Sequence, residues 1–162
     1  MQILQLTPQL PFPPDSGGRM GIFNSIKYTS RRHSVTVLSF VTGQTASYAR
    51  QLEQSCARVV TVPAAPTMPV VAIALNLFSS TPYTITKFQS PEMARQVRQL
   101  SESGRFDLVH IDHLHMAQYV RHLPTDLPAV LREHNVESVI MRRFAERAAS
   151  RFVKGYATLQ AR

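Results

Sequence analysis

Three stretches of the sequence hold the residues whose types and spacing could do chemistry. In the first, Gly17 and Gly18 precede an apolar helical pattern, and Arg19 follows them directly. Paired glycines at the start of a helix let backbone N–H groups approach a ligand, and the positive end of the helix dipole favours an anion such as phosphate. We therefore expect substrate binding at these residues, although the same composition is also typical of an ordinary turn.

The second stretch is His110-Ile111-Asp112-His113-Leu114-His115, which combines imidazoles with a carboxylate. A metal ion would need such ligands to converge, but strand alternation sends His110 and His113 to opposite faces, and no His-x-x-x-His helix motif is present. We therefore expect no metal site. The pattern favours a packed His110, with Asp112 and His113 at the strand end, where they can meet a polar ligand.

The third stretch, Arg132-Glu133-His134-Asn135, allows two interpretations. In one, Asn135 caps a helix and Arg132 pairs with Glu133 in solvent. In the other, His134 and Asn135 reach the same ligand as the second stretch, because loops at the carboxyl ends of strands are enriched in function. Both interpretations stay open at this point.

Dinucleotide binding is a further alternative, because Ser16-Gly17-Gly18-Arg19-Met20-Gly21 approaches a G-x-G-x-x-G pattern. A proline-rich loop separates these residues from the strand before them, and Ser39-Phe40-Val41-Thr42 offers no acid to hold a ribose. Neither a Walker loop, a Gly-x-Ser-x-Gly elbow nor a carboxylate dyad is present. We therefore expect no cofactor and no self-contained hydrolase.

The elements that must position these stretches alternate along the chain. Apolar or β-branched runs predict strands over residues 3–7, 34–41, 58–62, 106–111 and 129–131. Residues 63–89 are irregular, and a clear helix start at Ser90-Pro91-Glu92 leads to a helix ended by Gly104. Two later helices are predicted. The first carries the apolar residues Met116, Tyr119, Val120 and Leu123. The second is long and begins at Asn135; its apolar side holds Val139, Ile140 and Phe144, and its outer side holds Arg142, Arg143 and Arg147.

This succession predicts an α/β fold, with a doubly wound, mainly parallel, Rossmann-like sheet in the order 3-2-1-4-5 flanked by helices. In that order the first and fourth strands are neighbours, and the chain winds away from them in opposite directions. The loops from Asp15 to Arg19 and from Asp112 to His115 then face one crevice. We expect the ligand there.

Composition restricts the class of protein. A chain of 162 residues with 44% hydrophobic content is globular, and we expect one domain over residues 1–162. The formal charge of +8 indicates anionic partners, but no zinc-finger or ribonucleoprotein motif accompanies it, so nucleic acid is not expected. Cys56 is the only cysteine, which suits a reducing cytoplasm, and the amino terminus reads as a strand rather than a secretory signal. The apolar residues 68–78 are too few to span a bilayer but can lie on a membrane surface or cap a pocket.

Several segments carry a resemblance to a known family. They are Ile3-Leu4-Gln5-Leu6-Thr7-Pro8 with Pro13-Pro14-Asp15-Ser16-Gly17-Gly18-Arg19, then Arg31-Arg32-His33-Ser34-Val35-Thr36-Val37, then Phe106-Asp107-Leu108-Val109-His110-Ile111-Asp112-His113, and Leu131-Arg132-Glu133-His134-Asn135-Val136-Glu137. Together they resemble the amino-terminal half of family 4 glycosyltransferases, retaining enzymes of the GT-B fold, and among them bacterial sugar transferases of exopolysaccharide and surface-glycan pathways. The resemblance covers nearly the whole chain.

The resemblance implies two Rossmann-like domains facing a cleft, the first binding the acceptor and the second holding a nucleotide-sugar through a Glu-x7-Glu motif. This chain has no glutamate pair at that spacing, so it is expected to be half of the enzyme and to need the missing C-terminal domain. Gly17 and Gly18 correspond to the loop that approaches the donor phosphate or the acceptor. Many members carry a histidine near the transferred sugar at the position of Asp112; His113 lies beside it and is assigned here as the catalytic residue.

The expected function is therefore acceptor binding during sugar transfer from a nucleotide-sugar donor to a glycan or lipid-linked acceptor. The basic charge and the apolar residues 68–78 fit a cytoplasmic protein that meets such an acceptor at the inner face of the cell membrane. Two alternatives remain open. One is the same half-fold in a GT-B sugar-nucleotide epimerase, and the other is a non-catalytic anion-binding module.

Overall fold

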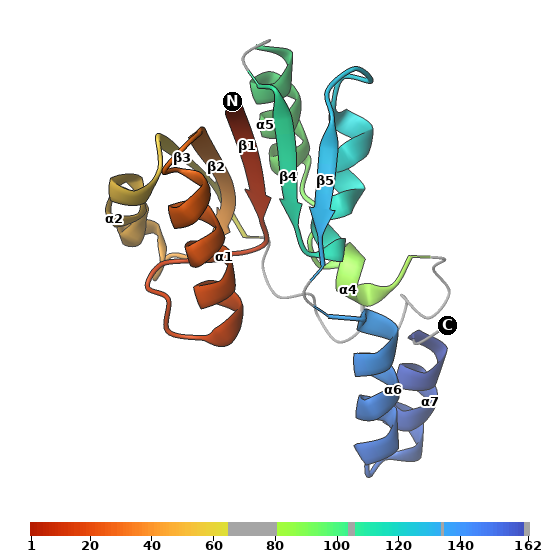
Figure 1. Cartoon of the computed structure of the whole chain (residues 1–162). Coiled ribbons are helices and arrows are strands. Elements are labelled where there is room, and N and C mark those ends of the chain that lie inside the picture. The colour runs from red at the N-terminus through yellow and green to blue at the C-terminus, as the bar shows by residue number, and fades with distance from the viewer. Residues whose placement is uncertain (65–80, 104–105, 134, 161–162) are drawn as a thin grey trace.

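A five-stranded sheet, parallel throughout, runs through the computed structural model, which describes residues 1–64, 81–103, 106–133 and 135–160 (Figure 1). Its strands are β1 (Gln2–Thr7), β2 (Ser34–Val41), β3 (Arg58–Pro63), β4 (Leu108–Asp112) and β5 (Ala129–Arg132). They lie in the order β3-β2-β1-β4-β5, and each neighbouring pair is parallel. The predicted fold class, strand order and direction are confirmed.

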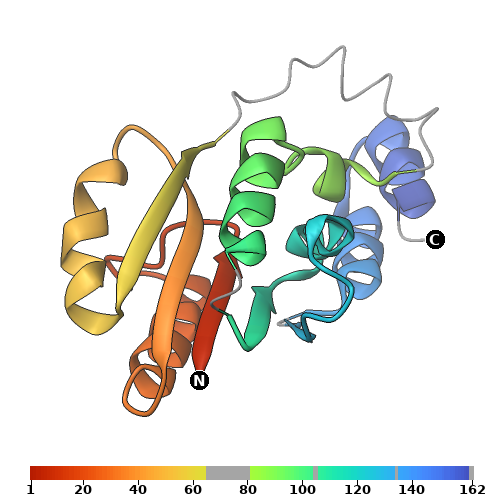
Figure 2. The ribbon, with the colours of Figure 1, turned by 90° about the horizontal axis from the view of Figure 1, so that it is seen from above.

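Helices cover both faces of this sheet (Figure 2). On one face lie α1 (Gly17–Thr29) and α2 (Ala49–Leu52), and on the other lie α5 (Pro91–Glu102) and the 3-10 helix η4 (Leu114–His122). The remaining helices are the short η1 (Ala46–Tyr48), η2 (Glu53–Ser55) and α4 (Tyr83–Thr86), followed by α6 (Glu137–Arg147) and α7 (Arg151–Gln160). Coverage of both faces is what an all-parallel sheet requires, because its strands are apolar on both sides.

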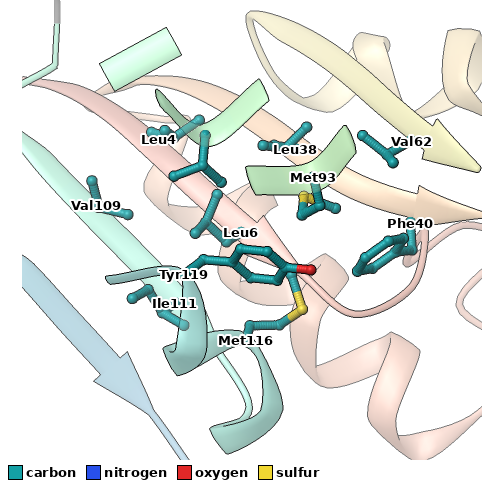
Figure 3. Close-up of a cluster of buried hydrophobic side chains, with 11 residues drawn as sticks. Leu4, Leu6, Leu38, Phe40, Val62, Met93, Val109, Ile111, Met116 and Tyr119 are labelled. Atoms are coloured by element: carbon teal, nitrogen blue, oxygen red, sulfur yellow. The ribbon is translucent and has the colours of Figure 1, made fainter. Parts of the chain in front are cut away.

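Each face of the sheet has its own apolar core. On the α1 face, Ile22 and Ile26, one turn apart, pack with Val35 and Val37 of β2. On the α5 face, Figure 3 shows side chains of β1, β2, β3 and β4 meeting those of α5 and η4. Alternate residues of one strand therefore serve different cores: Ile3 belongs to the first, and Leu4 to the second.

The predicted start of α5 is confirmed in detail. Ser90 lies at the N-cap, and its hydroxyl oxygen accepts a hydrogen bond of 3.2 Å from the backbone N–H of Met93. Pro91 occupies the first helical position and Glu92 the first turn, where a carboxylate suits the helix dipole. The helix ends at Glu102, and the predicted terminator Gly104 lies outside the described residues, as does the apolar stretch 68–78.

The element after β4 differs from the α-helix expected there, because it is a 3-10 helix. With three residues per turn, Met116 and Tyr119 align and are buried in the core of the α5 face. Val120 is turned away and exposed, although the expected α-helix would have placed it with them. The exposure of Val120 therefore follows from the three-residue turn of the 3-10 helix.

The last predicted helix is corrected in two respects. Asn135 is not its N-cap: Val136 holds that position with an extended backbone, no side-chain cap hydrogen bond forms, and Asn135 is exposed one residue further out. The single long helix is in fact two, α6 and α7, because Ala148 leaves the helical conformation. The two helices pack on each other and bury Ala145 and Ala157.

The edge strand β5 and the α6–α7 hairpin are less covered than the rest of the fold. Val130 and Leu131 point to opposite faces of the sheet and are 51% and 41% exposed. Figure 1 shows the hairpin standing beyond the tips of β4 and β5 instead of lying on the sheet. Within the described ranges, no helix is long and apolar enough to cross a membrane.

Matched truncations in β2 and β5 will test where the core ends. Leu38→Ala removes a side chain with no exposed surface and is expected to lower the free energy of unfolding by about 2–5 kcal/mol, through lost burial and an unfilled cavity. Leu131→Ala, at the exposed edge, is expected to cost less than about 1 kcal/mol. Urea unfolding measures both values, and equal losses would contradict the burial pattern described here.

Candidate substrate site

The carboxyl end of β4 is organised around Asp112, whose side chain has no exposed surface. The amide nitrogen of Gln5, on the neighbouring strand β1, donates a hydrogen bond of 2.5 Å to the Asp112 carboxylate. From the other side Arg132 Nη1, at the end of β5, lies 3.3 Å from Asp112 Oδ1. A buried carboxylate is stable only when such partners replace water. One acidic group therefore links three adjacent strands near their carboxyl ends.

The same arginine connects this group to α1. Arg132 Nη1 also donates to the backbone oxygen of Gly21, at 3.2 Å, and Gly21 lies one turn after Gly17. The structure thus brings the first turns of α1 and the end of β4 together through one guanidinium. This is the edge where open α/β sheets bind ligands.

The predicted glycine loop lies at the beginning of α1, with both glycines exposed. Ser16 is the N-cap, but its side chain makes no cap hydrogen bond, and a Cβ on Gly17 would meet no atom within 4 Å. A Cβ on Gly18 would lie 3.9 Å from the Gln9 amide nitrogen, which is an ordinary contact. The fold itself therefore accepts side chains at both positions. Arg19 pairs with Asp15 at 2.8 Å on the surface beside them.

His113 follows Asp112 with a backbone conformation that is rare for a residue with a side chain. Its φ is 71° and its ψ 144°, and it is the one non-glycine residue with positive φ among those described. Such a conformation costs of order 1–3 kcal/mol and persists only where neighbours fix it. Here the His113 N–H donates to the Arg132 carbonyl at 3.0 Å, and the His113 carbonyl accepts from the Met116 N–H at 3.0 Å. Strain of this kind concentrates at functional sites.

An aromatic stack lies next to His113. The rings of Phe88 and His115 are parallel to within 10°, with centroids 4.5 Å apart, and the His113 ring is 5.4 Å from that of His115. Burial, together with the nearby charges of His113 and Lys87, lowers the pKa of His115 to about 4. His115 is therefore neutral at physiological pH and able to accept or donate one hydrogen bond through each ring nitrogen.

The other predicted residues are placed less centrally. His110 is half-buried inside β4, in register with Gln5 and Val130. Asn135 is exposed between β5 and α6, and His134 lies outside the described residues. Among the described side chains, no group of three or more His, Cys, Asp or Glu residues is arranged to hold a metal ion.

Two cavities of the described chain lie at the opposite, amino-terminal edge of the sheet. One, of about 500 Å³, is lined by residues that include Lys27, Arg31 and His33. Cys56 also lines it, and burial raises the pKa of this thiol to about 11. The other, of about 710 Å³, is lined chiefly by polar side chains such as Gln96. Neither of these two cavities is lined by a residue predicted for the site.

Sequence reasoning missed the role of Arg132, which was considered only as a solvent-exposed partner of Glu133. The signal was available: opposite charges end two strands that the predicted order makes neighbours, and Asp112 and Arg132 are indeed in register. The Phe88–His115 stack had no such signal, because Phe88 belongs to a segment without a regular pattern.

A double-mutant cycle will test the Asp112–Arg132 pair. Asp112→Asn, Arg132→Gln and the double variant should give a coupling of about 0.5–3 kcal/mol in the free energy of unfolding, because the carboxylate has no contact with water. The surface pair Glu92–Arg95, changed to Gln in the same way, is expected to give less than about 0.5 kcal/mol. Equal couplings, measured by urea unfolding, would show that Asp112 is not held by Arg132.

An NMR titration of the His115 ring will test the stack. The expected pKa is near 4, and Lys87→Gln should raise it because one facing cation is lost. The unfolded chain protonates near 6.5, so the stabilising effect of neutral His115 is complete above about pH 6.5 and is lost as the pH falls toward 4. After allowance for solvent screening, acidification from pH 7 to 5 should cost about 1 kcal/mol more in this chain than in His115→Gln. A pKa of His115 near 6.5 would show that its ring is not buried in the stack.

Comparison with known proteins supports the fold. No family model matches the chain, and neither does any curated protein. Two solved structures of the C-terminal domain of PF1911 hydrogenase from Pyrococcus furiosus are similar. The first, residues 83–215, has 17% sequence identity and a TM-score of 0.51, and the match covers 81% of this chain and 90% of that one. The second, residues 78–226, has 18% sequence identity and a TM-score of 0.50, and the match covers 80% of this chain and 89% of that one. At this identity the similarity shows that the chain has a Rossmann-like parallel α/β fold.

Proposed function

We propose that this chain is the acceptor-binding lobe of a retaining glycosyltransferase, which transfers a sugar from a nucleotide-sugar donor to a glycan or lipid-linked acceptor. The observation that carries the proposal is the bridge from Asp112 through Arg132 to Gly21. It joins two segments that resemble family 4 glycosyltransferases to the helix that follows a third, the glycine loop, and all three lie far apart in the sequence. A substrate at this edge would meet all three.

The chemistry available at this edge suits sugar transfer. Exposed backbone N–H groups at the start of α1, with the positive end of its dipole, would hold a phosphate of the donor or acceptor. His113, fixed by its backbone bonds, would lie against the transferred sugar and stabilise the charge that develops as the phosphate departs. In this proposal Arg19, His134 and Asn135 contribute to substrate binding. Catalysis would rest on positioning and on charge stabilisation.

The exposure of the glycine loop also fits a two-lobed enzyme. In such an enzyme the cleft forms between the lobes, so one lobe by itself presents an exposed edge. Gly17 and Gly18 are both exposed at the start of α1, which fits a position on such an edge. The proposal assigns the donor nucleotide to a second domain, which would carry the Glu-x7-Glu motif.

Binding measurements on the present chain will test the proposal. The probe is a short-chain prenyl diphosphate sugar, and the prenyl alcohol serves as the uncharged comparison. In NMR titrations of the full chain, the probe should shift the backbone amides of Gly17, Gly18 and His113, while the alcohol should not. Gly18→Gln should reduce the affinity at least tenfold, because its side chain occupies the approach to the helix start that is open here.

Gly155→Gln is the matched control, because that glycine lies in α7 and an added Cβ there would meet no atom within 4 Å, so that the helix accepts a side chain there as α1 does at Gly18. It should bind the probe as the unchanged chain does, and circular dichroism should show both variants folded. Binding that survives Gly18→Gln would exclude the glycine loop from the site. Binding of inorganic diphosphate alone, with no added affinity from the sugar, would instead favour a non-catalytic anion-binding module.

A further inference from the structure

The α6–α7 hairpin carries an exposed row of apolar side chains that the proposed function does not use. The row consists of Val136, Ile140 and Phe144, which are 65%, 42% and 53% exposed. A spacing of four residues places Ile140 and Phe144 on one side of α6, and Val136 is the N-cap at its start. Ala145, which is buried against α7, lies on the opposite side of the helix. The apolar row therefore faces away from the rest of the hairpin.

Two arginines border this row. Arg143 and Arg147 lie one turn apart on the same side of α6 as Ile140, and both are exposed. The hairpin also exposes other cations on α6 and α7, namely Arg142, Arg151 and Lys154. Its carboxylates are Glu137 and Glu146. An apolar row bordered by arginines is the composition of a helix that lies in a membrane interface.

We propose that the α6–α7 hairpin docks on an anionic lipid bilayer, with Ile140 and Phe144 entering the headgroup region and the surrounding arginines meeting lipid phosphates. Burial of exposed apolar surface and attraction to an anionic leaflet act together in such binding. Arginine suits this contact because its planar guanidinium pairs with phosphate oxygens in two places.

Charge decides between a bilayer and a second copy of this chain. Two copies meeting through this face would bring Arg143 and Arg147 against the same residues of another molecule with a formal charge of +8. Like charges brought together at an interface are unfavourable, whereas an anionic surface complements them. The observed combination of exposed aromatic and cationic side chains therefore favours lipid.

The position of the hairpin indicates at which end of the sheet a bound bilayer would lie. Figure 1 shows α6 and α7 side by side beyond the tips of β4 and β5, which is the edge that holds Asp112 and His113. A bilayer bound by the hairpin would lie at that end of the sheet. The inference does not depend on the proposed function, because it uses none of the residues assigned to substrate.

The absence of tryptophan from the sequence allows a direct test. Phe144→Trp places a single fluorophore in the apolar row, and Tyr28→Trp places one at an exposed aromatic position of α1, beside Arg31. Vesicles of phosphatidylcholine with phosphatidylglycerol should shift the emission of the Phe144→Trp variant to shorter wavelength, and brominated lipids should quench it. Vesicles of phosphatidylcholine alone should give a much smaller response. The Tyr28→Trp variant should not respond to either vesicle.

Flotation with the same vesicles will separate the apolar contribution to lipid binding from the electrostatic one. The pair Ile140→Ser and Phe144→Ser, and separately the pair Arg143→Gln and Arg147→Gln, should each lower the partition coefficient about tenfold or more. Arg31→Gln with Arg32→Gln removes equal charge from exposed positions after α1 and should lower it far less. Circular dichroism will verify that all variants are folded, and Gly18→Gln should bind vesicles normally, so that this test is independent of the substrate site.

Three outcomes would overturn the proposal. One is an equal response of the two tryptophan variants, and another is an equal loss of flotation for the two arginine pairs. The third is concentration-dependent self-association in light scattering without lipid that Phe144→Ser abolishes. That result would assign the face to a second copy of the chain.

Discussion

A carboxylate buried in the sheet is the constraint on which the candidate site depends. Asp112 has no exposed surface, so its charge must be balanced by protein groups, and Gln5 and Arg132 supply them from the strands on either side. Since Arg132 also binds the Gly21 carbonyl, the same charge fixes where α1 begins relative to the sheet. The Arg132–Gly21 bond, together with the packing of Ile22 and Ile26 on the sheet, thus helps to position the glycine loop.

Around His113 the chain is held at several points that compensate for its unusual backbone. The carbonyl of Phe88 accepts a hydrogen bond from the Tyr119 hydroxyl at 2.5 Å, and the amide of Gln118 donates to the carbonyl of Ile85 at 3.1 Å. These bonds tie α4 and the residues after it to η4, and the Phe88 ring then stacks on His115. A strained residue persists when its surroundings are fixed in this way. The α5 face of the sheet is therefore directly involved in presenting His113.

The sheet was predictable because each strand carries a compact apolar run and the crossovers allow only right-handed parallel winding, which leads to the order 3-2-1-4-5. Asp112 and His113 were predictable at the strand end for the same reason. Features that depend on tertiary packing were not predictable from the sequence. The 3-10 period of η4 and the break at Ala148 have no local signal. Exposure of Ile140 and Phe144 contradicts their amphipathic spacing, because α6 packs on α7 and not on the sheet.

Cys56 has a practical consequence for work with this protein. With its pKa raised to about 11, the only thiol in the chain stays protonated at neutral pH, and a protonated thiol is a poor nucleophile. Its sulfur also donates to the Leu52 carbonyl at 3.4 Å within a half-buried environment. A second cysteine introduced at a solvent-facing position would thus react first with maleimide dyes or spin labels, and the native residue need not be replaced before labelling.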